Sequence, residues 1–142
     1  MKDAIQKLLD FAKDWGLQLE VNYDTHWVGR HAHCIGIPTK RQLKRKIWRG
    51  FFWVMPQGDM LCFYAPANPT AEELKKTYHL DLENLDLGAS PDNATALRIK
   101  ISQVDFDDAF HRKFIQYILN ARAQHCGRQL KKKISGWAGG CG

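Results

Sequence analysis

The sequence lacks any long apolar run, because no stretch approaches the ~20 consecutive apolar residues that a membrane-spanning helix needs. Its first residues, Met-Lys-Asp-Ala-Ile-Gln-Lys, also lack the uninterrupted apolar segment of a secretory signal peptide. We therefore expect a protein that acts in the cytoplasm and does not associate with a membrane.

Sequence motifs for nucleotide-dependent and serine-hydrolase chemistry are missing as well. There is no P-loop, no G-x-G-x-x-G and no G-x-S-x-G. The four cysteines, Cys34, Cys62, Cys126 and Cys141, form no C-x-x-C pair, so reduced thiols are expected rather than a disulfide framework. These absences favour a protein without a cofactor and, as the leading interpretation, without enzyme activity.

Acidic residues are concentrated in the middle of the chain, and this makes the charge distribution uneven. The net charge is +5 over residues 1–58, −6 over residues 59–108 and +7 over residues 109–142, where no acidic residue occurs. If the two basic ends converge on one surface, a polyanion is the partner that this surface attracts most readily.

The length of 142 residues, with 44% apolar and 25% charged residues, fits one ordinary globular domain. We expect this domain over residues 1–127, followed by a basic, glycine-rich C-terminal tail over residues 128–142. The fold class is α+β: a mostly antiparallel sheet of about five strands, packed by the N- and C-terminal helices. Hydrophobic periodicity predicts helices over residues 3–15, 40–48, 71–78 and 105–125, and strands over residues 17–21, 25–37, 51–55, 60–64 and 95–103.

Local signals support several of these boundaries. Gly16 stands where a left-handed residue ends the first helix, and Asn22–Asp24 is expected to be a turn. Thr70 and Glu73 have capping-box spacing, and Asp105 is expected to cap the last helix. Pro56-Gln57-Gly58-Asp59 predicts a hairpin turn between two aromatic strands. Because both faces of these strands are apolar, we expect them at the centre of the sheet.

The strongest functional candidate is the basic segment over residues 40–49, which is expected to be a helix. Six of its ten residues are Lys or Arg and none is acidic, so one face can contact several phosphates. An exposed Trp48, Phe52, Trp53 or Tyr64 would add base stacking. The same pattern is also typical of a solvated helix face with aromatic residues in the core. The candidate binding residues in this segment are Lys40, Arg41, Lys44, Arg45, Lys46, Trp48 and Arg49.

Two further basic groups are candidates for the same surface. Arg98 and Lys100 share one face of a predicted strand. The tail contributes Arg128, Lys131, Lys132 and Lys133, which are equally compatible with a solubilising role.

Histidines offer a weaker candidate for chemistry. In a strand, His31 and His33 point to one side about 7 Å apart, and His26 or a cysteine would be a third ligand in a zinc site. The pair is also compatible with acid–base catalysis. No second motif at ligand spacing follows, so we expect neither a metal site nor a catalytic site. Asp105, Asp107 and Asp108 are explained by helix capping rather than by magnesium binding.

The leading hypothesis is a small, non-catalytic accessory protein that binds DNA, RNA or a nucleic-acid–protein complex through the basic segment and tail. Its size and single domain suit a phage or mobile-element protein. One alternative is an inhibitor or subunit that docks on a nucleic-acid-processing enzyme, with its acidic middle mimicking phosphates. Another is a small nuclease or hydrolase that uses His31 and His33.

Overall fold

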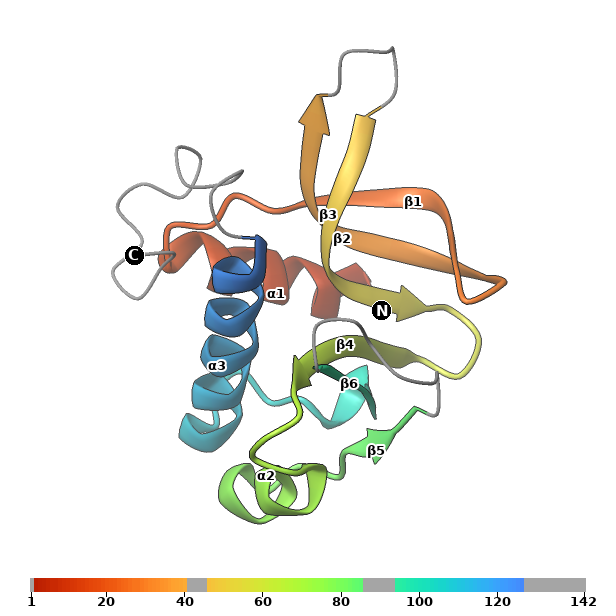
Figure 1. Cartoon of the computed structure of the whole chain (residues 1–142). Coiled ribbons are helices and arrows are strands. Elements are labelled where there is room, and N and C mark those ends of the chain that lie inside the picture. Colours follow the sequence, from red (N-terminus) through yellow and green to blue (C-terminus); the bar gives the residue numbers. More distant parts are fainter. Residues whose placement is uncertain (1, 41–45, 86–93, 127–142) are drawn as a thin grey trace.

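A six-stranded antiparallel sheet, in the order β1-β2-β3-β4-β6-β5, organises the computed structural model (Figure 1). The structure describes residues 2–40, 46–85 and 94–126. The first four strands follow one another as a meander, and the chain then crosses to β5 and returns through β6 beside β4. The elements are α1 (Lys2–Asp14), β1 (Glu20–Trp27), β2 (Arg30–Lys40), β3 (Lys46–Met55), β4 (Met60–Pro66), α2 (Ala71–Tyr78), β5 (Glu83–Asn84), β6 (Ala94–Lys100), a 3-10 turn (Ile101–Gln103) and α3 (Ala109–Cys126).

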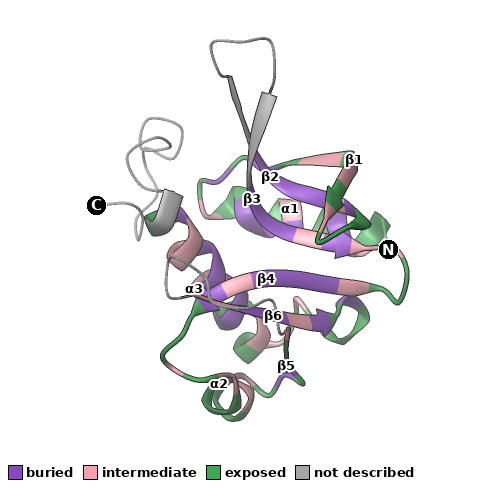
Figure 2. Cartoon of the chain, turned by 45° about the vertical axis from the view of Figure 1, so that its right-hand side comes forward, coloured by how far each residue is buried: buried purple, intermediate pink, exposed green. Residues whose placement is uncertain are grey.

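The core lies between one face of the sheet and the helices (Figure 2). Helix α1 contributes Leu8 and helix α3 contributes Phe114, both fully or almost fully buried. From the sheet, Phe52 and Phe63 meet edge to face, and Phe63 meets Phe114 in the same way. Burial of these side chains contributes roughly 1.5–3 kcal/mol each. The α+β prediction is therefore confirmed.

The packing of the sheet differs from the prediction in two respects. There are six strands rather than about five, because Glu83–Asn84 adds a short edge strand beside β6. Helix α2 also joins the core: Leu74 is buried, and the Tyr78 ring lies 5.2 Å from that of Phe114. The terminal helices therefore do not pack the sheet alone.

The predicted helix ends and central hairpin are confirmed where local signals set them. Gly16 follows α1 with φ 83°. The Thr70 hydroxyl accepts a hydrogen bond from the Glu73 N–H at 3.3 Å, in a capping box with the Glu73 carboxylate. Residues 56–59 form the turn between β3 and β4, which are the two central strands of the sheet.

The predicted turn at Asn22–Asp24 is wrong. These residues lie inside β1, and an irregularity between Asn22 and Thr25 in the pairing with β2 accommodates them. The reversal comes later, at Val28 and Gly29, which have φ of 53° and 73°. Two successive positive φ values fit the right-handed twist of a two-residue hairpin, so the turn forms there.

The helix predicted over residues 40–48 is also wrong. Lys40 ends β2, and residues 46–48 belong to β3; residues 41–45 lie outside the described residues. The antiparallel ladder continues through the pairs Pro38 with Trp48, Thr39 with Ile47 and Lys40 with Lys46. Pairing with β2, a contact that the local sequence pattern does not contain, decides the structure here.

The last helix begins later than predicted. Asp108 caps it, since its carboxylate accepts hydrogen bonds from the Phe110 N–H at 2.8 Å and the His111 N–H at 3.1 Å. Asp105 instead accepts from the Asp107 N–H in the preceding turn. Phe110, in the first turn of α3, is 45% exposed. No helix in the described residues is long and apolar enough to cross a membrane.

Candidate nucleic-acid interface

Strands β2 and β3 extend past the rest of the sheet as a two-stranded projection. Strand β1 pairs with β2 as far as Gly36, opposite Glu20. From Ile37 to Lys40, the recorded partners of β2 are residues 49 to 46 of β3. Figure 1 shows these paired ends pointing away from the body of the molecule. We call residues 37–49, including the connecting residues 41–45, the basic arm.

The basic arm contains all the candidate binding residues of the first basic segment. Lys40 and Lys46 face each other across the ladder, and Trp48 and Arg49 pair with Pro38 and Ile37. The outer candidates, Arg41, Lys44 and Arg45, lie outside the described residues, as do Arg128, Lys131, Lys132 and Lys133. For Lys40, Lys46 and Arg49, the backbone of a strand pair thus replaces the predicted helix.

The two cations of β6 lie apart from the arm. Strand β4 separates β6 from β3, and Figure 1 shows the arm pointing away from β6. Arg98 is paired with Glu83, with 2.8 Å between Nη2 and Oε2, while Lys100 is exposed at the strand end. The structure therefore does not bring Arg98 and Lys100 together with the basic arm.

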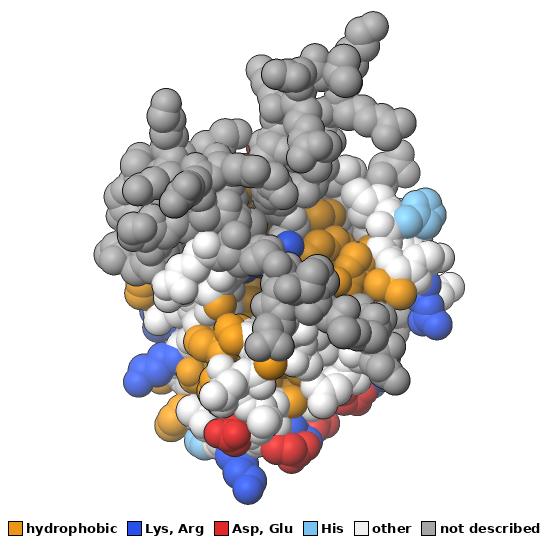
Figure 3. All heavy atoms as spheres, in the orientation of Figure 1, with side chains coloured by type: hydrophobic (Ala, Val, Ile, Leu, Met, Phe, Trp, Pro, Cys, Tyr) orange, Lys and Arg blue, Asp and Glu red, His pale blue; other side chains and the backbone are white. Residues whose placement is uncertain are grey.

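Acidic side chains gather at the other end of the molecule, low in the view of Figure 3. Lys75 lies 3.7 Å from a Glu72 carboxylate oxygen and 3.9 Å from that of Asp81. Together with the pair of Glu83 and Arg98, these contacts offset part of the negative charge on α2 and β5. This surface is consequently a weak mimic of a phosphate backbone.

The sheet face opposite the core carries an aromatic cluster, which we define as Trp27, Trp53 and Tyr64. The Trp27 and Trp53 rings are stacked, with 5.3 Å between centroids and 15° between planes. The Tyr64 ring stands edge-on to both, at 6.0 Å from Trp27 and 5.5 Å from Trp53. All three side chains are half-buried. Figure 3 shows hydrophobic side chains on this side of the molecule, with a basic side chain beside them.

The glycine at the base of the arm fixes the position of the central indole. A Cβ added to Gly50 would overlap the Trp53 ring, so only glycine lets this ring lie flat over the strand. The pairing of β2 with β3 also shifts next to Gly50: Gly36 pairs with Gly50 and Ile35 with Phe52. Phe51, between them, is an extra residue of β3 in this pairing, and it is fully buried. The bulge directs Phe51 into the core while Trp53 stays on the opposite face.

Arg122 of α3 completes this surface. Its Nε donates a hydrogen bond to the Gly50 carbonyl oxygen at 2.8 Å. Its guanidinium carbon lies 5.6 Å from the Tyr64 ring centroid and 5.9 Å from that of Trp53. Within the described residues, no carboxylate lies within ion-pair distance of Arg122. The cluster is thus a half-buried aromatic surface with one fixed positive charge.

Two cysteines lie beneath the aromatic cluster and are unreactive. Cys34 and Cys62 are the direct strand partners of Trp53 on its two sides, and both are buried free thiols. Burial raises the pKa of each thiol to about 11, although Arg122 lowers that of Cys34 and Arg98 that of Cys62. Both thiols are therefore protonated near neutral pH and unsuited to nucleophilic chemistry.

The three histidines that the sequence suggested do lie together, on the β1–β2 hairpin. The ring centroids of His26 and His31 are 6.0 Å apart, and those of His31 and His33 are 5.1 Å apart. The His33 ring also meets Tyr23 edge-on at 4.9 Å. In the part of the chain that the structure describes, no group of three His, Cys, Asp or Glu side chains has a geometry that could hold a metal ion.

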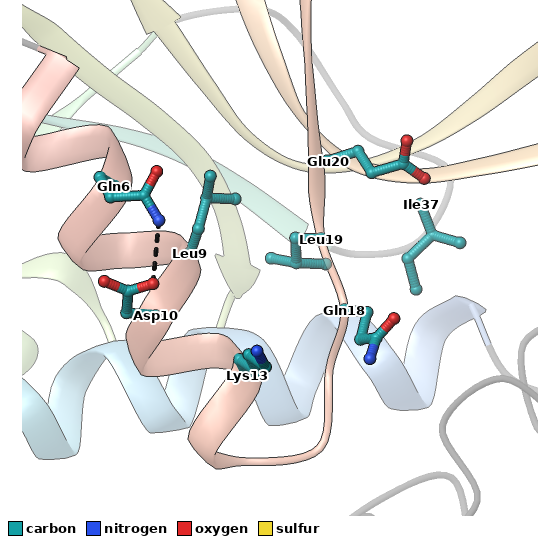
Figure 4. A pocket seen from close by; sticks show the side chains of 8 residues that line it. All are labelled: Gln6, Leu9, Asp10, Lys13, Gln18, Leu19, Glu20 and Ile37. Atoms are coloured by element: carbon teal, nitrogen blue, oxygen red, sulfur yellow. Dashed lines mark hydrogen bonds between the residues drawn. The ribbon is translucent and has the colours of Figure 1, made fainter.

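An open hollow of about 570 Å³ lies between α1 and the start of the sheet (Figure 4). Leu9, Leu19 and Ile37 form its apolar part, and a hydrogen bond of 2.9 Å from the Gln6 amide to the Asp10 carboxylate crosses one side. Its remaining polar lining mixes Lys13 with Glu20, so no single charge dominates. Nothing in this lining resembles a set of catalytic groups.

Comparisons with protein-family models, with characterised proteins and with solved structures gave no match.

Sequence reasoning missed Trp27 and Arg122 as parts of a site. Trp27 is 26 residues before Trp53 in the chain, and Arg122 is 72 residues from its partner Gly50, so only the folded sheet brings them together. One signal was present: Ala32, Cys34 and Gly36 give β2 a face of small residues, typical of a strand on which large neighbours lie.

Proposed function

We propose that this protein is a non-catalytic nucleic-acid-binding accessory protein whose basic arm contacts backbone phosphates. The observation that carries the proposal is the continuation of the β2–β3 ladder to the pair Lys40 and Lys46. Lys40, Lys46 and Arg49 lie on two strands that leave the body of the sheet, and the sequence between these strands adds Arg41, Lys44 and Arg45. A two-stranded ribbon is narrow enough to enter the major groove of B-DNA or to follow a single strand.

Electrostatics supplies the affinity in this mechanism. Each phosphate that a Lys or Arg side chain neutralises releases condensed counterions, so binding weakens steeply as salt rises. The acidic side chains of α2 and β5 lie at the end of the molecule opposite the arm, where they repel phosphates least (Figure 3). Contacts of this kind orient the protein and carry little sequence information.

A salt titration tests the proposal. Binding of labelled DNA and RNA is measured by fluorescence anisotropy from about 50 to 200 mM salt, where six phosphate contacts weaken binding about a thousandfold. The proposal predicts a linear decrease of log affinity with log salt concentration. No binding at the lowest salt, or an affinity that salt does not change, contradicts it.

The grouping of His26, His31 and His33 favours a second candidate function, histidine-dependent cleavage of nucleic acid. Neighbouring imidazoles are able to serve as general acid and base in such a reaction. If the candidate is right, the pure protein cleaves RNA, and the double variant His31→Ala/His33→Ala loses this activity while His79→Ala keeps it. Intact RNA after incubation with the unmodified protein excludes the candidate.

A further inference from the structure

The aromatic cluster and Arg122 together have the chemistry of a nucleotide site. The cluster offers half-buried indole and phenol rings, and unpaired bases stack on such rings whatever their sequence. Arg122 adds a planar, permanently charged group whose fork of N–H donors matches the oxygens of a phosphate. The guanidinium carbon lies within 6 Å of the ring centroids of Trp53 and Tyr64, and the Trp27 ring is stacked on Trp53.

The hydrogen bonding of Arg122 leaves donors available for a ligand. Toward the residues that the structure describes, its Nε donates to the Gly50 carbonyl, while an arginine carries five N–H donors in total. A partly buried guanidinium is stable when an anion pairs with it, and the described residues supply none within ion-pair distance. The contact to Gly50 and the two rings hold the group in place, so an incoming anion meets an ordered charge.

The position of this surface relative to the basic arm indicates which ligand it takes. Gly50, which holds Arg122, comes directly after Arg49, the last basic residue of the arm. A strand of nucleic acid that follows the arm toward the body of the sheet therefore arrives at the aromatic cluster. Bases inside a duplex are stacked on each other and are not free to stack on protein rings, whereas those of a single strand are.

We propose that the aromatic cluster and Arg122 bind single-stranded nucleic acid, with an unpaired base stacked on Trp27 and an adjoining phosphate on the Arg122 guanidinium. This inference rests on the proposed function, since the basic arm delivers the strand. It adds a preference: the arm alone attracts duplex and single strand alike, and the cluster distinguishes them.

The test compares a single strand of about 15 thymidines with a duplex of the same length, by anisotropy on the full chain. In Trp27→Ala, single-strand affinity falls about fivefold to a hundredfold and duplex affinity changes less than twofold. Trp27→Phe retains a ring and keeps affinity near that of the unmodified protein. Arg122→Lys keeps the charge but loses the fork of guanidinium N–H donors, and it also weakens single-strand binding.

The matched control for Trp27→Ala is Tyr23→Ala. It removes an exposed aromatic side chain that is also on β1 and that packs on His33.

Two readouts separate the possible failures. Circular dichroism and thermal unfolding establish that each variant is folded, and the quenching of tryptophan fluorescence by the single strand, reduced in Trp27→Phe, reports on stacking independently of affinity. Unchanged single-strand binding in Trp27→Ala, or equal losses for duplex and single strand, overturns the inference and leaves the basic arm as the site. No binding of either nucleic acid by the unmodified protein overturns the proposed function as well.

Discussion

At the scale of single residues, Val28 adopts a backbone conformation that its side chain disfavours. Its φ is 53°, and the side chain is 57% exposed at the tip of the β1–β2 hairpin. The left-handed region costs an L-residue roughly 1–2 kcal/mol, and β-branching adds crowding. Val28 thus gains little from burial to offset this strain.

Replacing this valine is expected to stabilise the protein. Asn followed by glycine is favoured in such a two-residue turn, so Val28→Asn should raise the free energy of unfolding by about 1 kcal/mol. Urea denaturation at constant pH measures the change. A variant less stable than the unmodified protein would show that the Val28 side chain makes contacts outweighing the backbone strain.

At the scale of elements, the cap of α3 makes stability depend on pH. The hydrogen bond from the backbone N–H of His111 is the largest cause that lowers the pKa of the Asp108 carboxyl; desolvation opposes it, and the hydrogen bond from the Phe110 N–H adds to the lowering. Because the folded pKa lies below the unfolded value of about 3.9, the ionised cap stabilises the fold above that pH. The contribution is lost as pH falls through the folded pKa.

Thermal unfolding of Asp108→Ala measures this dependence. The melting temperature of the variant should lie below that of the unmodified protein at about pH 6, and the gap should narrow as the pH is lowered toward about 2 and the Asp108 carboxyl becomes protonated. Asp107→Ala is the matched control, since the recorded hydrogen bond of Asp107 uses its backbone N–H and not its carboxylate. A gap of constant size across this range would mean that the charge of Asp108 plays no part.

The elements that the sequence predicted well are those whose signals are local. The capping box at Thr70, the glycine after α1 and the turn after Met55 depend on residues within a few positions, and all three are present. The helix over residues 40–48 was predicted wrongly because residues 46–48 pair with residues 38–40 of β2, a contact that the local pattern does not contain. The histidine grouping was foreseen from strand alternation, whereas the contact of Arg122 with Gly50 requires the whole sheet.

At the scale of the whole molecule, the charge distribution is uneven, although Lys75 and Arg98 pair with carboxylates of the acidic end. The basic arm projects at one end and the acidic side chains of α2 and β5 lie at the other, with the aromatic cluster and Arg122 next to the base of the arm. Under the proposed function, such a distribution would orient the arm toward a polyanion before contact and increase the rate of association. The proposed function assigns the phosphate contacts to the arm and not to the overall positive charge.

The measurement that tests this claim most directly is the salt dependence of nucleic-acid binding in two variants with equal net charge. Each variant carries three Lys→Gln substitutions. The arm variant replaces Lys40, Lys44 and Lys46, and the α1 variant replaces the exposed side chains Lys2, Lys7 and Lys13. We predict that the magnitude of the slope of log affinity against log salt falls by about 2 to 3 for the arm variant, from the loss of three phosphate contacts, and stays near that of the unmodified protein for the α1 variant. Equal slopes in the two variants would contradict it.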